Sequence, residues 1–424
     1  MVERDLVIIG GGPAGLAAAE SAYDAGVHDI LVLEREPRLG GILNQCVHNG
    51  FGLHTFNEEL TGPEYAQRYI DRVRQRNIDC LLSTTVINVS RDKTVTAVNA
   101  QNGVMTIKAK AVIFACGCRE RPRGAINIAG ARCAGIYSAG TAQKLVNMEG
   151  FMPGKEVVIL GSGDIGLIMA RRMTFEGCKV KACVELMPYS SGLNRNIVQC
   201  LNDFGIPLML SHTVVKINAC RGRLSSVVIA AVDDKLNPVP GTESEIACDT
   251  LLLSVGLLPE NELAKTAGVE LSPVTGGAEV DDDMMTGTDG VFECGNVLHV
   301  HDLVDFVSRE SALAGEKAAE YIKNGAAKKG DCVSFTTFGG VRYVVPQKLR
   351  KNGENKELSL KMRVGRVMKN VRLDVIADGK TVVSKPRRVV APGEMELITL
   401  TPEQTALLRG ANEISVGING GDKQ

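Results

Sequence analysis

A glycine-rich segment that occurs twice is the feature of this sequence that most restricts its fold. Each copy follows a short apolar run, residues 6–9 or 157–160, and each has the spacing Gly-x-Gly-x-x-Gly. A segment rich in apolar residues comes next, and an acidic residue, Glu34 or Glu185, stands 19 positions after the last glycine. A strand, a tight turn and a helix in this order predict an α/β unit with a parallel sheet. The chain is therefore expected to contain two such units.

The repeat extends beyond the glycines. Residues 77–86 align with residues 205–214, and each stretch leads into alternating strands and then an apolar strand that stops at glycine, 111–117 or 250–256. Similarity at this spacing indicates a duplicated supersecondary unit. We predict an α/β fold with two Rossmann-like, three-layer domains, and two bound dinucleotides.

The residue types explain why such a unit binds a dinucleotide. The first glycine permits a tight turn, the second lets the backbone approach a pyrophosphate, and the third allows close helix–strand packing. The helix N-terminus offers free N–H groups and a positive dipole end to the phosphates. The carboxylate of Glu185 would accept hydrogen bonds from a ribose and repel a 2′-phosphate, and Leu186–Pro188 supplies no cation beside it. NAD(H) is therefore favoured over NADP(H) in the second copy.

This arrangement resembles the two-dinucleotide-binding flavoprotein superfamily of pyridine nucleotide-disulfide oxidoreductases, which includes glutathione reductase, thioredoxin reductase and NADH peroxidase. Further matching segments are Leu39–Gly41, Ala115–Gly117, Ser254–Gly256 and Thr286–Asn296. The resemblance implies that the first copy binds FAD and that the second is an NAD(H) domain inserted into it. The implied boundaries are 1–120 and 250–328 for the FAD domain, 121–249 for the NAD(H) domain, and 329–424 for a β-rich C-terminal domain.

The resemblance also implies two sets of cofactor-binding residues. Those for FAD are Gly10, Gly12, Pro13, Ala14, Gly15, Glu34, Arg35, Gly40, Gly41, Ala115, Gly117, Gly295, Asn296, Glu310 and Ser311. Those for NAD are Gly161, Gly163, Asp164, Ile165, Gly166, Glu185 and Gly256. Asn296 replaces the aspartate that is usual after Gly295, and its amide can still hydrogen-bond a ribityl hydroxyl. Glu310 and Ser311 are expected where a helix starts beside the flavin and points its N–H groups at the pyrimidine edge.

The cysteines do not form the pairs that a disulfide reductase needs. The segment after Gly41 contains only Cys46, close to His48, and neither a C-x4-C nor a C-x-x-C pair occurs where such enzymes carry one. Cys46 could cycle through a sulfenic acid as in NADH peroxidases, or serve as a packed thiol. Cys116 and Cys118 lack a second pair, so we interpret them as structural and predict no metal site. His54, His299 and His301 also lie in segments expected near the flavin, as proton donors or packing groups.

The composition changes near Gly330 to short strands and turns, which predict a small β-sandwich without a catalytic motif. This tail, the segment 39–53 and the segment 135–143 resemble the NADH-oxidising flavoprotein subunits that accompany glycerol-3-phosphate dehydrogenase, and the related FAD subunits of opine and amino-acid dehydrogenases. The resemblance implies an FAD-dependent NADH oxidoreductase that passes electrons to dioxygen or to a redox centre on a partner protein. The alternatives are a peroxide- or disulfide-reducing enzyme that uses Cys46, and a non-catalytic subunit with bound dinucleotides.

Bulk properties narrow the partners and the compartment. The formal net charge is −1, from 48 Lys and Arg against 49 Asp and Glu, so no global field attracts nucleic acid or an anionic membrane. The amino terminus leads directly into an apolar strand, and the 12 cysteines are scattered rather than densely spaced. We therefore expect a cytoplasmic protein without a membrane span, which binds a nicotinamide dinucleotide and pairs with a partner redox subunit or with itself.

Overall fold

The computed structural model describes residues 2–325 and 331–421, which fall into two compact units. The first unit contains the residues up to Cys118 and those from Pro259 onward, and the second contains Arg119–Leu258. The two crossovers between the units contain the short strands β9 (Cys118–Glu120) and β19 (Leu257–Pro259). Among the described residues, no helix is long and apolar enough to cross a membrane.

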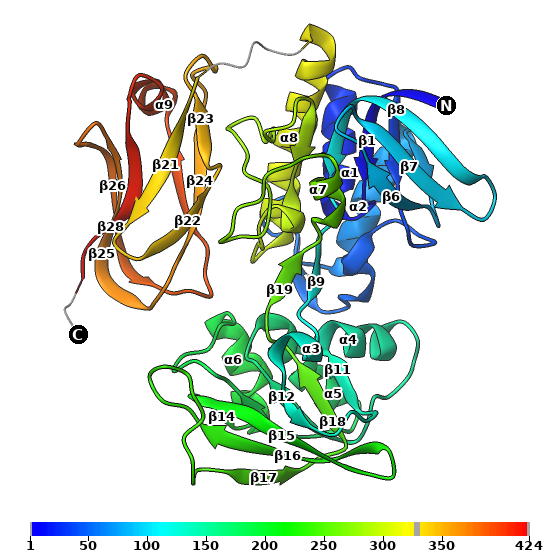
Figure 1. The fold of residues 1–424 in the computed structure, drawn as a ribbon, viewed down its shortest axis with the longest axis vertical. Coiled ribbons are helices and arrows are strands. Elements are labelled where there is room, and N and C mark those ends of the chain that lie inside the picture. The colour runs from blue at the N-terminus through cyan, green and yellow to red at the C-terminus, as the bar shows by residue number, and fades with distance from the viewer. Residues whose placement is uncertain (1, 326–330, 422–424) are drawn as a thin grey trace. The chain divides into compact units, whose positions relative to one another are not determined.

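A seven-stranded sheet forms the centre of the first unit (Figure 1), in the order β5-β2-β1-β8-β7-β6, with β20 also paired to β8. Its strands are β1 (Val2–Ile9), β2 (Ile30–Leu33), β5 (Asp79–Leu81), β6 (Thr85–Val89), β7 (Thr94–Asn99), β8 (Gly103–Phe114) and β20 (Val291–Glu293). β1 lies between β2 and β8 and is parallel to both. The run Leu6–Ile9 is buried, as expected for a parallel strand that is covered on both faces.

Two helices pack closely on this sheet. They are α1 (Pro13–Asp24) and α8 (Val304–Asn324), which lie side by side in Figure 1. Small side chains allow the close approach, because a Cβ added at Gly315 of α8 would lie 2.1 Å from the carbonyl oxygen of Ala18 in α1. Other elements around the sheet are α2 (Gly62–Gln75), α7 (Glu262–Thr266), β3 (Asn49–Phe51) and β4 (Leu60–Thr61).

The second unit contains a five-stranded parallel sheet in the order β11-β18-β12-β13-β14. These strands are β11 (Ile136–Ser138), β12 (Glu156–Leu160), β13 (Lys179–Val184), β14 (Leu208–Met209) and β18 (Thr250–Leu253). The helices of this unit are α3 (Arg123–Ile126), α4 (Ala139–Asn147), α5 (Asp164–Phe175) and α6 (Asn194–Cys200). A four-stranded sheet adds β10 (Ala129–Gly130), β15 (His212–Cys220), β16 (Arg223–Ala231) and β17 (Ser244–Ala247).

The predicted domain boundary before Thr250 differs from the boundary in the structure. Strand β18 hydrogen-bonds to β12 in the middle of the second unit's sheet, so residues 250–258 belong with that unit. The predicted boundary comes too early because it assigns this apolar strand to the FAD domain. The opposite boundary, predicted after residue 120, lies after Cys118.

The two units repeat each other in detail, as the aligned segments predicted. Ser83 and Ser211 both have a positive φ, 49° and 53°, at equivalent positions of the alignment. The N–H of Glu34 donates to Leu81, and the N–H of Glu185 donates to Met209 at the equivalent position. The alignment of residues 77–86 with 205–214 is therefore confirmed at the level of single backbone contacts.

Residues 331–421 form two further sheets within the first unit, orange to red in Figure 1. Their order is β23-β21-β28-β25-β26 and β22-β24-β27. The elements are β21 (Cys332–Phe338), β22 (Val341–Val345), β23 (Lys348–Arg350), β24 (Leu358–Val364), β25 (Met368–Ala377), β26 (Lys380–Val390), β27 (Glu396–Leu400), α9 (Pro402–Arg409) and β28 (Ile414–Gly420). Both sheets contribute to one apolar core, which agrees with the predicted β-rich sandwich. We call this part the C-terminal sandwich.

Candidate functional site

The turn between β1 and α1 leaves space where a dinucleotide phosphate would need it. A Cβ added at Gly10, whose φ is +111°, would lie 2.4 Å from the carbonyl oxygen of Ala115. A Cβ at Gly15 would lie 1.8 Å from the carbonyl oxygen of Gly10. At Gly12 the nearest atom would be the Cα of Gly41, at 3.8 Å. Gly10 and Gly15 are thus required by packing, whereas Gly12 borders open space, which fits the role of admitting a pyrophosphate.

The N-terminus of α1 is suited to bind an anion. Gly12 is its N-cap and makes no side-chain cap, and Pro13 occupies the first turn, which contains no acidic residue. The first N–H groups of a helix lack intrahelical acceptors, and they carry the positive end of the helix dipole. This end of α1 can therefore receive the phosphates of a dinucleotide without competition from a carboxylate.

The acidic residues that end β2 and β13 make matching contacts. Glu34 is buried, and its carboxylate accepts from the N–H of Gly11 at 2.7 Å and from the N–H of Glu36 at 2.8 Å. Glu185 accepts from the N–H of Ser162 at 2.8 Å and from the N–H of Met187 at 2.9 Å. Each carboxylate is therefore fixed against its own glycine-rich turn, the position from which it could also accept ribose hydroxyls.

Several of the other residues predicted to bind FAD lie against the turn between β1 and α1. A Cβ at Gly295 would lie 2.8 Å from the Cβ of Ala14, so Gly295 and Asn296 lie next to the start of α1. Gly41 lies against Gly12, and Ala115 against Gly10. Gly40 precedes Gly41, the side chain of Arg35 is exposed beside Glu34, and a Cβ at Gly117 would meet nothing within 4 Å. Gly41, Ala115 and Gly295 thus come from separate segments of the chain and meet at the turn between β1 and α1.

The second unit has an equivalent cradle with an additional acidic residue. Cβ atoms at Gly161 and Gly166 would lie 2.1 Å and 2.7 Å from atoms of Ser254, while one at Gly256 would meet nothing within 4 Å. Asp164 begins α5 and accepts from the N–H of Leu193 at 2.8 Å. Gly163 is the N-cap of α5, and Ile165 follows Asp164 in its first turn. Through Asp164, the backbone of Leu193 is thus held at the start of α5.

Glu310 and Ser311 do not lie at a helix start, and this part of the prediction is wrong. Helix α8 begins at Val304, so Glu310 and Ser311 are its seventh and eighth residues, about two turns from the start, and both are buried. The first turn instead carries Asp305, whose carboxylate accepts from the N–H groups of Gly52 and Thr55 at 3.2 and 2.8 Å. Asp305 therefore ties the loop after Cys46 to the start of α8, a role that no sequence signal indicates.

Glu310 lies instead at the centre of a buried polar cluster. Its Oε1 accepts from the N–H of Gly295 at 3.0 Å. Its Oε2 lies 2.9 Å from Nε2 of His299, 3.3 Å from Nε2 of His301 and 2.6 Å from Nζ of Lys361. Burial alone would raise the pKa of Glu310, but Lys361 and the two histidines hold this pKa well below its usual value. Burial and the neighbouring His301 lower the pKa of His299 to about 3.

The structure disfavours Cys46 as a redox nucleophile. Burial raises the pKa of its thiol to about 12, and its Sγ donates to the carbonyl oxygen of Ile42 at 3.3 Å. The residue also packs against α2, because a Cβ at Gly62 would lie 2.8 Å from the Cβ of Cys46. A thiol in this state is protonated at neutral pH, whereas the thiolate is the reactive form.

The remaining sulfur and histidine candidates make packing contacts. Burial raises the pKa of Cys116 to about 12. The Nδ2 of Asn296 lies 3.8 Å from the Sγ of Cys118. The ring of His48 packs against Phe51 with centroids 5.1 Å apart, and His54 stacks on Phe306 at 5.5 Å.

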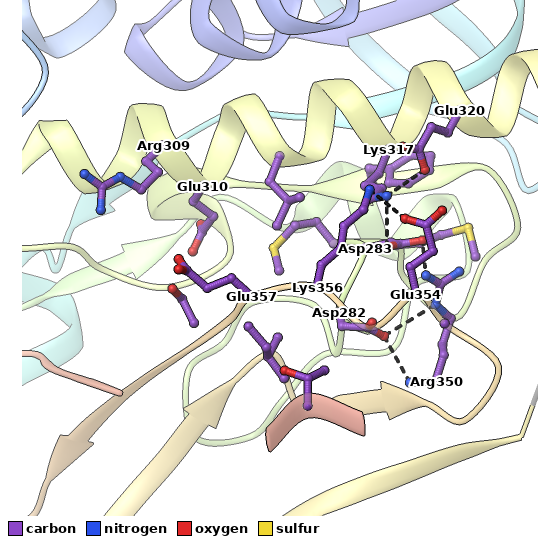
Figure 2. Close-up of a pocket in the computed structure, with 18 of the residues that line it drawn as sticks. Asp282, Asp283, Arg309, Glu310, Lys317, Glu320, Arg350, Glu354, Lys356 and Glu357 are labelled. Atoms are coloured by element: carbon purple, nitrogen blue, oxygen red, sulfur yellow. Dashed lines mark hydrogen bonds and ion pairs between the residues drawn. The ribbon is translucent and has the colours of Figure 1, made fainter. Parts of the chain in front are cut away.

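A cavity of about 450 Å³ lies within the first unit between α8 and the C-terminal sandwich. At one end of the cavity, shown in Figure 2, charged residues pair with each other. Lys317 pairs with Glu320 on α8, and Arg350 lies beside Asp282 and Asp283. Glu310 lines the cavity near Arg309 and Glu357 in this view. The cavity is separate from the cradle at Gly12, because none of the cradle glycines lines it.

Cations of the C-terminal sandwich make contacts that the sequence did not predict. Lys361 binds Glu310, Arg363 binds Asp302, and Arg409 binds Asp282 at 2.6 Å. No local sequence signal marks these cations, because their partners lie on segments distant in the chain. The His-x-His spacing of His299 and His301 is visible in the sequence, but it does not reveal that both rings share Glu310 as a partner.

Comparison with known proteins places the chain among flavin enzymes. Residues 4–310 match the family model described as pyridine nucleotide-disulphide oxidoreductase. An opine oxidase subunit of Agrobacterium tumefaciens is 28% identical over 346 residues, which cover 74% of this chain and 63% of that protein. Thioredoxin reductase of Listeria innocua is 27% identical over 326 residues, which cover 75% of this chain and 94% of that protein.

Solved structures show the same fold. The crystal structure of thioredoxin reductase from T. acidophilum has a TM-score of 0.63 at 22% identity, and it covers 76% of this chain and 99% of that chain. An NAD-dependent persulfide reductase from A. fulgidus has a TM-score of 0.58 at 21% identity, and it covers 88% of this chain and 68% of that chain. The chain thus spans under two thirds of the opine oxidase subunit but nearly all of the length of the Listeria thioredoxin reductase.

Proposed function

Because the chain belongs to the pyridine nucleotide-disulphide oxidoreductase family, whose members are FAD-dependent pyridine nucleotide oxidoreductases, we propose that it oxidises NADH. Bound FAD would supply a two-electron carrier that accepts hydride from the nicotinamide. The electrons would then go to dioxygen or to a redox centre on a partner protein. The observation that carries this proposal is the paired cradle, in which Glu34 and Glu185 make equivalent contacts with two glycine-rich turns.

The residues of each cradle divide the work. In the first unit, Gly12 and the N-terminus of α1 would hold the pyrophosphate of FAD, Glu34 a ribose, and Asn296 the ribityl chain. In the second unit, Gly163 and the N-terminus of α5 would hold the pyrophosphate of NADH, and Glu185 its adenosine ribose. Glu185 is buried and accepts two backbone N–H groups, which hold its carboxylate where it would repel a 2′-phosphate.

The electron acceptor is inferred from the relatives and from the state of Cys46. Relatives named as parts of larger enzymes, the opine oxidase subunit and the small chain of glutamate synthase from Mycobacterium tuberculosis, favour a partner protein as acceptor. The protonated, packed state of Cys46 argues against the alternative of peroxide or disulfide reduction through that residue. A non-catalytic subunit is the remaining alternative, which a turnover assay separates from the proposal.

Steady-state reduction of an artificial dye by NADH and by NADPH tests the proposal. We expect turnover with a kcat/KM for NADH at least about tenfold above that for NADPH, which corresponds to about 1.4 kcal/mol. The matched variant is Gly163→Ala, which should raise the KM for NADH while the flavin content, set by the other unit, is unchanged. A preparation that contains flavin but does not oxidise NADH would leave the non-catalytic alternative in place of this proposal.

A further inference from the structure

The C-terminal sandwich places one lysine inside the polar cluster of the FAD-binding part. Lys361 is on β24, its side chain is 12% exposed, and its Nζ lies 2.6 Å from Oε2 of Glu310. Glu310 has a fully buried side chain, and its other oxygen accepts from the N–H of Gly295. A buried carboxylate is stable only when it is paired and hydrogen-bonded, so Lys361 supplies the charge that Glu310 requires.

The histidines of the cluster connect Glu310 to Asn296. The N–H of His301 donates to Oδ1 of Asn296 at 3.0 Å, which fixes the orientation of that amide. The ring of His301 then has Oδ1 of Asn296 at 3.3 Å from Nδ1, and Oε2 of Glu310 at 3.3 Å from Nε2. Both ring nitrogens of His301 therefore face acceptors, so a proton added to this ring would gain a hydrogen bond.

His299 behaves differently from His301. Its Nε2 faces Glu310, while its Nδ1 is buried and has no hydrogen-bond partner among the described residues. A neutral ring that donates from Nε2 satisfies this arrangement, and a second proton on Nδ1 would be buried without an acceptor. The other charged or titratable groups nearby are the pair Arg363 and Asp302 and the buried Glu293, which interacts electrostatically with Glu310. Burial raises the pKa of Glu293 to about 8, so it is mostly neutral at pH 7. With His299 neutral, the charge of the cluster is set by Glu310, Lys361 and His301.

The same three side chains, His299, His301 and Glu310, are the only group among the described residues with the geometry of a metal site. The ammonium of Lys361 lies at hydrogen-bond distance from the one carboxylate oxygen that both histidines share. A divalent cation there would place two further positive charges beside a buried lysine, which Coulomb repulsion opposes. The arrangement fits a balanced ion pair better than a metal ligand set.

We propose that Lys361 is a positioning residue that neutralises Glu310 beside Gly295 and Asn296, and thereby sets the reduction potential of the flavin bound at that pair. This rests on the proposed assignment of Gly295 and Asn296 to FAD. Reduction brings electrons to the flavin, so any uncompensated negative charge nearby disfavours it. The C-terminal sandwich thus has an electrostatic role at the cofactor in addition to its packing.

The charge of the cluster can be changed in both directions. Lys361→Met leaves the charge of Glu310 uncompensated, and Glu310→Gln leaves that of Lys361 uncompensated. The double variant is neutral again, and Lys361→Arg keeps the positive charge. We expect the equilibrium ratio of reduced to oxidised flavin, measured anaerobically against a reference dye at pH 7, to fall on the order of tenfold in Lys361→Met. A tenfold change corresponds to about 30 mV for a two-electron couple.

The matched variants define the expected pattern. Glu310→Gln should shift the ratio in the opposite direction, and the double variant and Lys361→Arg should stay within about threefold of the wild type. The difference between Lys361→Met and the wild type should shrink at low pH, where proton uptake by the cluster restores neutrality. If Lys361→Met does not fold, Glu310→Gln and the double variant still give the test. Equal potentials in these two variants, or a stoichiometric metal ion in the wild-type protein, would overturn the proposal.

A second readout does not depend on flavin. The protein has 6 histidines, so their rings can be followed by ¹⁵N NMR in flavin-free protein. Lys361 helps to lower the pKa of His299, so Lys361→Met should raise the pKa of this ring by about one unit or more, and the double variant should reverse this. A protein that cannot bind flavin but shows this pattern contradicts the proposed function and leaves the charge balance intact. Titrations that do not respond to Lys361→Met contradict the charge balance itself.

Discussion

Substitution of Gly12 and of Gly15 by alanine should affect different properties. Gly15→Ala should lower the stability of the fold, whereas Gly12→Ala should lower the affinity for flavin. In Gly15→Ala the new Cβ would lie 1.8 Å from the carbonyl oxygen of Gly10, so α1 would have to move away from β1 by roughly 1.5 Å. Overpacking of this kind costs about 1–3 kcal/mol or more, and we expect the free energy of unfolding to fall by about 3 kcal/mol. In Gly12→Ala the nearest atom is 3.8 Å away and φ is −80°, so alanine fits.

Gly12→Ala should therefore spare the fold and impair the cofactor. Replacing glycine by alanine at an N-cap costs up to about 1 kcal/mol of stability. The added methyl group borders the space left for the pyrophosphate, so we expect flavin affinity to fall at least about tenfold, or about 1.4 kcal/mol. Urea unfolding of the flavin-free proteins measures the first effect, and titration of flavin fluorescence measures the second. Wild-type flavin affinity in Gly12→Ala would show that no phosphate lies at Gly12, and wild-type stability in Gly15→Ala would show that α1 does not need its close approach to Gly10.

Three further predictions concern single side chains. Burial raises the pKa of Glu293 to about 8, so the folded protein holds this proton more tightly than the unfolded chain does, and stability is lost as the pH rises from about 4.5 to 8. Glu293→Gln keeps an acceptor for the N–H of Ala278 and should remove this pH-dependent loss of stability. The loss amounts to on the order of 4 kcal/mol at pH 8 and can be measured by denaturant unfolding. Parallel pH profiles of the two proteins would contradict this prediction. Cys46→Ser should keep NADH-dependent dye reduction within about twofold, and a loss of most activity would restore the thiol alternative. Glu185→Gln should lower the preference for NADH over NADPH about tenfold in kcat/KM, and an unchanged ratio would show that another group selects the nucleotide.

The duplicated cradle could be predicted from the sequence because local rules determine it. Each glycine-rich turn needs its first and last glycines for a close approach that any Cβ would block, and the acidic residue is fixed by its distance along a short helix and strand. The equivalent positive φ of Ser83 and Ser211 shows that the similarity reaches the backbone conformation. The fold class and the membership in the flavoprotein family followed from these features.

The polar cluster could not be predicted because it depends on tertiary contacts. Helix α8 begins at Val304 without a side-chain cap at Leu303, so no local signal marks its start. Glu310, predicted at this start, lies nearly two helical turns further along α8. Lys361 lies on a strand with alternating burial that resembles any other half-exposed strand. Its contact with Glu310 exists only because the C-terminal sandwich docks against α8. The predicted domain boundary before Thr250 is wrong for a related reason, since strand pairing rather than composition decides which sheet a strand joins.

Anaerobic reaction of the flavin-loaded protein with NADH shows whether hydride passes between the two dinucleotides. We expect one equivalent of NADH to bleach one equivalent of bound flavin, and deuterium at the transferred C4 position of NADH to slow the bleaching. Flavin that is bound in stoichiometric amount but keeps its oxidised absorbance in excess NADH would show that no such transfer occurs.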